Sequence, residues 1–198
     1  MLSVVPARTA VVGVRSLQLN RVQDWFGPAF SQLHPLIQQL HRDGGELQGK
    51  VTLSFGSGLA QLLGVRLAKK MGLPLQPGEY DFSVAISHDD EALVWARTFN
   101  HANTMVSRFT PVGQYPDGYF VEKTGPIELR RRVDIVQGGW YWRQLATRLH
   151  GIWMPGFLLP QTNAYKTIDN DRYVFEVSTR YPLFGKLLEY KGILHITG

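Results

Sequence analysis

The chain contains no cysteine and no hydrophobic run as long as a membrane-spanning helix. The absence of cysteine excludes disulfides, thiolate zinc sites and a cysteine nucleophile, and it fits a reducing compartment. A spanning helix needs about 20 consecutive apolar residues, and the N-terminal residues lack the apolar core and cleavage site of a signal peptide. We therefore expect a cytoplasmic protein without a transmembrane segment, whose 198 residues suffice for a sizeable core.

Motifs for metal, dinucleotide and nucleic-acid binding are also absent from the sequence. The six histidines form no H-E-x-x-H pair, and no glycine-rich dinucleotide fingerprint follows a predicted strand. The net charge is +5, but the basic residues are scattered except for Arg130, Arg131 and Arg132. Arg131 interrupts the apolar set of its predicted strand, so we expect its side chain to reach an edge of the sheet or to extend outward. We expect no metal, no cofactor and no nucleic-acid partner.

Residues 1–20 are expected to form a loose arm before a single domain over residues 21–198. Apolar side chains recur at helical spacing over residues 26–40, which predicts a helix. Pro35 lies inside that pattern and predicts a kink or a division into two short helices.

A second helix is predicted over residues 57–71. Ser57 is the expected N-cap, and Lys69 and Lys70 suit the negative end of the helix dipole. The leucine spacing predicts a core-facing side made of Leu59, Leu62, Leu63 and Leu67.

From Tyr80 onward, apolar and polar residues alternate with the period of two that is typical of strands. Turn signals such as Pro116-Asp117-Gly118 and Gly138-Gly139 separate these runs. With the segment over residues 46–55, we expect about ten strands joined by short connections, and neighbours that pair antiparallel. The predicted fold class is α+β, with two N-terminal helices packed on a long, strongly curved or barrel-like antiparallel sheet.

Five segments also carry a family resemblance. They are LHPLIQQLHRDGG, GSGLAQLLGVRLAKKMGLP, ISHDDEALVWARTFN, YPDGYFVEKTGPIELRRRVDI and LLPQTNAYKTIDNDRYVFEVSTRYPLFGKLLEYKGIL. Together they resemble the bacterial domain of unknown function 4166 family over about residues 26–196. In some bacteria that family is fused to saccharopine-dehydrogenase-like reductases or lies beside membrane modules. The resemblance therefore implies a reductase as one expected partner, and it assigns no catalytic residue.

The acidic turn over residues 89–91 predicts a hairpin whose register places Arg97 opposite Val84. Arg97 then shares an apolar face with Trp95. A guanidinium on such a face needs a carboxylate or a bound anion. Two alternatives follow, an ion pair with Glu122 and an anion-binding role in a pocket.

His88 ends the same face, close to Asp90. A nearby carboxylate raises the pKa of a histidine and orients its ring, which suits a general acid or base. The alternative is a histidine that caps the strand end at the rim. Tyr119 and Tyr141 are candidate hydrogen-bond donors in the same site.

The segment over residues 138–160 combines large rings with fixed charges. As a regular strand it places Arg143 on one face, and on the other Trp140, Trp142, Gln144, Ala146, Arg148 and His150. Mixed rings and donors resemble a pocket wall, and stacking of arginines on exposed rings is the alternative. The apolar stretch GIWMPGFLLP is expected to be a loop that covers the cavity, contacts a partner or touches a membrane.

The leading hypothesis is that the curved sheet binds a lipid-, polyketide- or terpenoid-like small molecule. An enzyme of this kind would be a cofactor-independent isomerase, cyclase or hydrolase. The alternative is a non-catalytic module that docks on a reductase partner or a membrane surface. The candidate catalytic residues are His88, Asp90, Tyr119 and Tyr141, and the candidate ligand-binding residues are Trp95, Arg97, Glu122, Trp140, Trp142, Arg143, Arg148 and His150.

Overall fold

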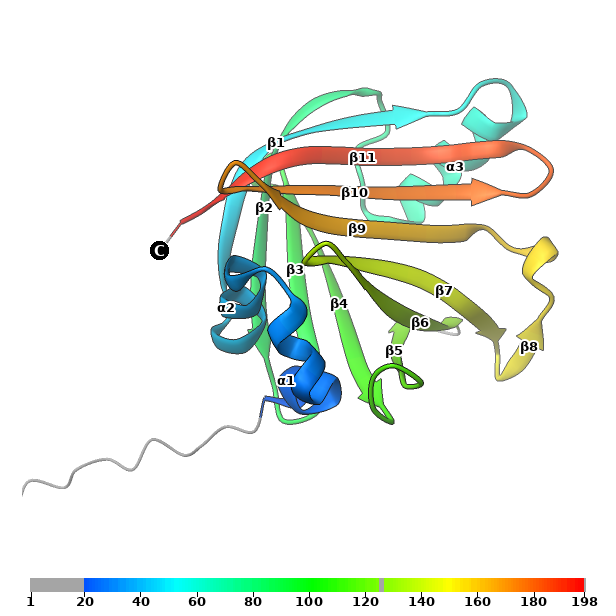
Figure 1. Ribbon diagram of the computed structural model, residues 1–198. Helices are drawn as coiled ribbons and strands as arrows, with labels where there is room; N and C mark the ends of the chain where they lie inside the picture. The colour runs from blue at the N-terminus through cyan, green and yellow to red at the C-terminus, as the bar shows by residue number, and fades with distance from the viewer. Residues whose placement is uncertain (1–19, 125–126, 198) are drawn as a thin grey trace, which may run out of the picture.

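The period-two segments form one antiparallel sheet that closes on itself (Figure 1). The computed structural model describes residues 20–124 and 127–197, so the expected N-terminal arm lies almost wholly outside the described residues. The strands are β1 (Gly45–Phe55), β2 (Gly78–His88), β3 (Leu93–Phe99), β4 (Asn103–Val112), β5 (Tyr119–Thr124), β6 (Ile127–Val136), β7 (Gly139–Leu149), β8 (Ile152–Met154), β9 (Gln161–Asp169), β10 (Arg172–Tyr181) and β11 (Gly185–Ile196).

The strand order is β6-β5-β4-β3-β2-β1-β11-β10-β9-β7, and a further pairing of β6 with β7 closes the ring. The sheet predicted from the sequence is therefore a closed barrel of ten antiparallel strands, with the short β8 paired beside β7. Closure gives each of the ten strands a hydrogen-bonded neighbour on both sides.

Three short helical segments cover one end of the barrel, which we call the helix-capped end (Figure 1). They are α1 (Arg21–Phe26), the 3₁₀ segment η1 (Gly27–Gln32) and α2 (Pro35–Asp43). The predicted division at Pro35 is confirmed, because Pro35 is the first residue of α2. Several hydrogen bonds join the cap to the barrel. Trp25 Nε1 donates to the Val112 carbonyl at 3.2 Å, and the His34 amide donates to the Gly138 carbonyl at 2.8 Å.

The helix α3 (Leu59–Met71) packs against β11 and β1 near the opposite end, which we call the α3 end (Figure 1). Its buried face is made of small residues, Ala60, Gly64 and Ala68. A Cβ atom on Gly64 would lie 2.1 Å from the Leu187 carbonyl oxygen, so the helix approaches the sheet backbone closely.

Two predictions about α3 are wrong. Gly58 rather than Ser57 is the N-cap, and no side chain caps the first turn. Leu59 and Leu62 are exposed, because the close approach at Gly64 turns the small residues toward the sheet and the leucines away from it. None of the helices in the described residues is long and apolar enough to cross a membrane.

The predicted register of the β2–β3 hairpin is confirmed, with Val84 opposite Arg97 and Ile86 opposite Trp95. The expected regular alternation along β7 is wrong. The β6–β7 register shifts between Arg130 and Arg131, which leaves Leu145 as an extra residue on β7.

The bulge at Leu145 reverses which side chains of β7 face the barrel interior. Trp140, Trp142 and then Thr147 are buried, whereas Arg148 and His150 fall on the outer side. Arg148 and His150 therefore do not share a face with the two tryptophans, contrary to expectation.

Strands β7 and β9 pair over only three residue positions, Trp140–Trp142 against Ala164–Lys166. Beyond that point β7 diverges and pairs with β8. The Gln144 side chain partly replaces the lost backbone pairing, because its Oε1 accepts from the Thr162 amide at 3.0 Å and its Nε2 donates to Thr147 Oγ1 at 2.9 Å.

Candidate functional site

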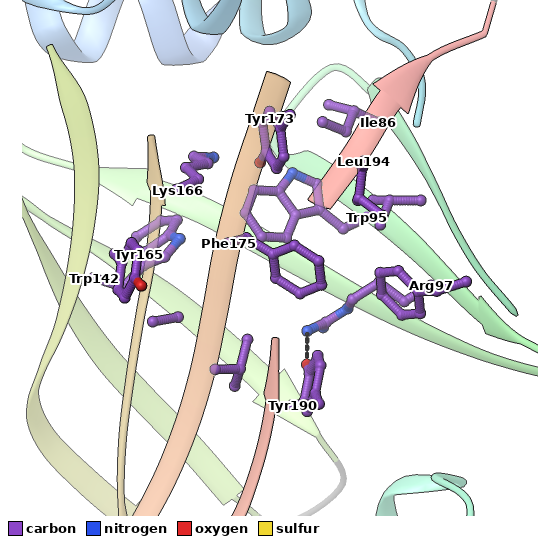
Figure 2. A pocket seen from close by; sticks show the side chains of 14 residues that line it. Ile86, Trp95, Arg97, Trp142, Tyr165, Lys166, Tyr173, Phe175, Tyr190 and Leu194 are labelled. Carbon is purple, nitrogen blue, oxygen red and sulfur yellow. Dashed lines mark hydrogen bonds between the residues drawn. The ribbon is translucent and has the colours of Figure 1, made fainter. Parts of the chain in front are cut away.

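The barrel encloses a small cavity with a mainly aromatic and aliphatic wall (Figure 2). The space that the centre of a water molecule can occupy there is about 30 Å³, enough for a few water molecules. The wall consists of Phe82, Val84, Ile86, Trp95, Arg97, Trp142, Ala164, Tyr165, Lys166, Tyr173, Phe175, Val177, Tyr190 and Leu194. Two of these residues, Arg97 and Lys166, carry basic groups in an otherwise aromatic and aliphatic cavity wall.

Lys166 on β9 is 2% exposed and lies between two indole rings. Its Nζ is 4.1 Å from the centre of the Trp95 ring and 3.9 Å from that of the Trp140 ring. Figure 2 shows the side chain extending from β9 toward Trp95. Among the described residues no carboxylate pairs with this amine, and its hydrogen-bond partner is His41 Nε2.

The α2 backbone determines the tautomer of His41. His41 Nδ1 lies 2.8 Å from the Ile37 carbonyl oxygen, which can only accept a hydrogen bond. Nδ1 therefore carries the proton, and the Nε2 lone pair accepts from Lys166.

Burial strongly perturbs both members of this pair. Loss of water lowers the pKa of Lys166 well below its ordinary value. Burial, followed by the charge of Lys166, likewise lowers the pKa of His41 well below its usual range. Cation–π contact with the two indoles favours the charged lysine, but full burial without a carboxylate favours the neutral amine more.

A second polar cluster lies on the same inner face. Arg131 Nε donates to Glu122 Oε2 at 2.8 Å, and both side chains are buried. Arg97 donates to the Tyr190 hydroxyl at 3.1 Å and to Ser107 Oγ (Figure 2 shows the Tyr190 bond). Arg131 thus points into the barrel rather than to a sheet edge or outward as expected, because a buried carboxylate is there to pair with it.

The carboxyl of Glu122 stays ionised inside the barrel. Burial alone raises its pKa, but the charges of Arg131 and Arg97 and hydrogen bonds from Ser107 and Arg131 outweigh burial and lower it. Of the two alternatives that the sequence leaves open for Arg97, a direct ion pair with Glu122 is not formed, and an anion-binding role stays a prediction. Glu122 pairs directly with Arg131, and Arg97 has no carboxylate in direct contact among the described residues.

Several buried donors near the cavity have no acceptor within the described protein. They are the indole Nε1 atoms of Trp95, Trp140 and Trp142 and the Nε atom of Arg97. Buried donors in folded proteins are nearly always paired, so such a group of unpaired donors is unusual.

The four candidate catalytic residues do not come together. His88 is half-buried near His41, and Asp90 is exposed in the β2–β3 turn, where its carbonyl accepts from Arg21 at 3.1 Å. Tyr119 lies under the Arg130 guanidinium, and Tyr141 stacks on Tyr165, with 5.4 Å between the ring centres. Neither contact involves His88.

The pKa of His88 is shifted opposite to expectation. Burial lowers it and outweighs the charges of Asp89 and Asp43, which raise it. The acidic turn does not dominate because Asp89 instead accepts hydrogen bonds from the Glu91 and Ala92 amides and pairs with Arg108.

The candidate ligand-binding residues divide between the two faces of the barrel. Trp95, Arg97 and Trp142 line the cavity, and Glu122 and Trp140 are buried next to it. The other three lie outside the cavity: Arg143 pairs with Asp134 at 2.8 Å, Arg148 stacks on Trp153 at 4.0 Å from the ring centre, and His150 is exposed.

Sequence reasoning missed Lys166 and His41. A signal for Lys166 was present, because it lies between Ala164 and Ile168 on the apolar face of its strand, as Arg97 does on β3. His41 gave no comparable signal, since a histidine on a helix is ordinary until its packing is known.

The chain belongs to the family described as Domain of unknown function (DUF4166), whose family model matches residues 33–194. The resemblance seen in the sequence is therefore confirmed. The search of curated proteins gives no match. A similar solved structure is that of a protein with unknown function from the DUF3598 family of Nostoc punctiforme, at 11% identity and a TM-score of 0.41. The match covers 78% of this chain and 47% of that one, so the chain spans about half the length of that protein.

The buried ion pair generates a stability prediction. Glu122→Gln should lower the free energy of unfolding by about 3–5 kcal/mol, because it leaves the Arg131 charge buried and unpaired. Urea denaturation at pH 7 measures the loss. The matched control is Asp134→Asn, which breaks the exposed pair with Arg143 and should cost at most about 1 kcal/mol. Similar small losses for both variants would contradict a buried charge at Arg131.

The lowered pKa of Lys166 generates a second prediction. At pH values between the lowered pKa of Lys166 and about 10.4, the pKa of a lysine in the unfolded chain, Lys166 is protonated in the unfolded state and neutral in the folded state. Stability should therefore rise with pH across this window. The same reasoning applies to His41 below about pH 6.5.

Lys166→Met should flatten the pH dependence of the unfolding free energy between pH 7 and 9, by up to about 1.4 kcal/mol per pH unit. Chemical denaturation at a series of pH values measures the slope. Lys123→Met, which removes an exposed lysine, should leave the slope unchanged. An unchanged slope in Lys166→Met would mean that Lys166 is charged in the folded protein.

Proposed function

We propose that the barrel binds a small molecule with an apolar body and an oxygen acceptor, either a carboxylate or a carbonyl group. The observation that carries the proposal is the surplus of buried donors around the cavity. Trp95, Trp142 and Arg97 line the cavity and each has a donor atom without a protein acceptor. Lys166 adds a further donor with no carboxylate partner among the described residues.

The chemistry of these donors defines the complementary ligand. An indole N–H and a guanidinium can donate but never accept. Leaving such a group buried without a partner costs about 1–3 kcal/mol. A ligand oxygen placed among them recovers that free energy, while the rings of the wall surround an apolar chain.

The size of the cavity restricts the ligand further. A space of about 30 Å³ for water centres suits a short or slender chain. A bulky lipid-, polyketide- or terpenoid-like molecule, the class expected from the sequence, would require wall side chains to move. Short-chain carboxylates and carbonyl compounds are therefore the first ligands to test.

Hexanoate should bind and hexylamine, of equal length but opposite charge, should not, because the cavity presents donors and positive charge. Isothermal titration calorimetry at pH 7 measures both. Arg97→Met should weaken hexanoate binding about 10- to 100-fold, the loss of one charge-assisted hydrogen bond. Arg143→Met, on the outer face, is the matched control and should bind like the wild type.

A conservative variant distinguishes a loss of ligand binding from a loss of folding. Trp142→Phe keeps a ring but removes one unpaired N–H, and it should weaken hexanoate while leaving the melting temperature close to the wild-type value. Equal affinity for hexanoate and hexylamine, or no binding of either, would refute an acceptor-specific site.

A second candidate function, docking on a membrane surface, is favoured by the α3 end. Among the residues that the structure describes, the four most exposed large hydrophobic side chains all lie there: Leu183 at 79%, Ile152 at 68%, Phe157 at 65% and Leu59 at 63%. They belong to the β10–β11 turn, β8, η2 (Gly156–Leu158) and α3, which lie on the same side of the barrel in Figure 1.

Charge is also divided between the two ends. The described connections at the α3 end, residues 56–77, 100–102, 150–160 and 182–184, contain Arg66, Lys69 and Lys70 and no acidic residue. The turns at the helix-capped end contain Asp89, Asp90, Glu91, Asp117 and Asp171. An apolar rim with basic residues complements an anionic lipid surface. Docking on a reductase partner stays a prediction, and no surface of the described residues is assigned to it.

Vesicle sedimentation tests the membrane candidate. The protein should bind phosphatidylcholine vesicles that contain phosphatidylglycerol more strongly than pure phosphatidylcholine vesicles, and added salt should weaken the binding. The double variant Phe157→Ser with Leu183→Ser should lose at least tenfold in binding, since each side chain buries apolar area. Val106→Ser with Leu145→Ser, exposed on the strands, is the matched control. If the protein binds neither kind of vesicle, membrane docking is refuted.

A further inference from the structure

Among the described residues, Lys166 is the one lysine that is buried. It combines three features that an amine nucleophile needs. Its side chain lines a cavity, the lone pair of His41 Nε2 is its hydrogen-bond acceptor, and no carboxylate of the described residues pairs with it as an ammonium ion. A structural lysine would be expected to reach solvent or a carboxylate, and Lys166 does neither.

We propose that Lys166 forms an imine with a small carbonyl compound that enters the cavity, with His41 as the proton acceptor. This inference rests on the proposed ligand cavity and narrows its ligand from any acceptor-bearing molecule to an aldehyde or ketone. An amine desolvated in an apolar pocket is a recognised way to activate lysine as a nucleophile.

The bond changes balance without an oxidant, a reductant or another reactant. The Nζ lone pair attacks the carbonyl carbon, the C=O π electrons move to oxygen, and a proton passes from Nζ to His41 Nε2. His41 Nε2 returns that proton to the oxygen, which gives the neutral carbinolamine. The second Nζ proton then passes through His41 Nε2 to the hydroxyl group as the C–O bond breaks, and water leaves. The nitrogen lone pair forms the C=N bond, so one amine and one carbonyl give one imine and one water.

Neighbouring groups suit each stage. Trp95 and Trp142 have unpaired N–H donors on the same cavity wall, which can bond to the oxygen as it gains charge. The Ile37 carbonyl keeps the His41 proton on Nδ1, which leaves the Nε2 lone pair free to accept a proton from Nζ. Tyr173 lines the same cavity, and burial raises the pKa of its phenol, which keeps it a neutral donor.

Pentane-2,4-dione is the probe, because a neutral amine converts it to a vinylogous amide that absorbs in the near ultraviolet. At pH 7 an exposed lysine is neutral only about once in a few thousand molecules. The wild type should therefore form the adduct on the order of a hundredfold faster than Lys166→Met. Lys123→Met should react like the wild type, and His41→Gln should react about a hundredfold more slowly with hexanoate affinity retained.

A second measurement uses only the wild-type protein, so its result does not depend on whether the variants fold. Butanal with cyanoborohydride reduces any imine to a stable secondary amine, and peptide mapping by mass spectrometry then locates it. Modification concentrated at Lys166 at pH 7 supports the proposal. Modification spread over exposed lysines, with hexanoate still bound, overturns the imine and leaves the ligand cavity standing. If Lys166 is not selectively modified and hexanoate does not bind, both the imine and the ligand cavity are overturned.

Discussion

The pairing of β6 with β7 is the interaction on which the rest of the structure depends. It closes the sheet and so removes water from whatever the inner face carries. On an open sheet, Arg97, Glu122, Arg131 and Lys166 would be ordinary solvated side chains. Inside a closed barrel each charged group needs a partner of opposite charge. Without such a partner, the pKa of the group shifts so that its neutral form is favoured.

The interior meets this requirement in two different ways. Glu122 and Arg131 remain charged because each neutralises the other at 2.8 Å. Lys166 has no counter-ion in the described protein and lies instead between the rings of Trp95 and Trp140. The first arrangement resembles a structural ion pair. The second leaves an unusual amine next to a cavity, and it is the more informative about function.

Sequence patterns predicted the fold well, because period-two alternation and turn residues are local signals. The β2–β3 register followed from the length of the acidic turn, and it correctly placed Arg97 with Trp95. The site was predicted only in part. The extra residue at Leu145 reverses the face of Arg148, and no local signal announces a bulge. The pairing of Lys166 with His41 joins residues 125 positions apart and depends on how α2 covers the barrel end.

The short seam between β7 and β9 has a consequence for how anything reaches the interior. Only three residue positions pair there, and the Gln144 side chain holds the strands together where the backbone ladder ends. Ala164, Lys166 and Trp142, which line the cavity, belong to those same positions. Local opening of a protein is easiest where the fewest bonds must break at once. Among the described strands of the ring, this pairing is the shortest, so the side wall beside Lys166 is where local opening requires the fewest backbone hydrogen bonds to break.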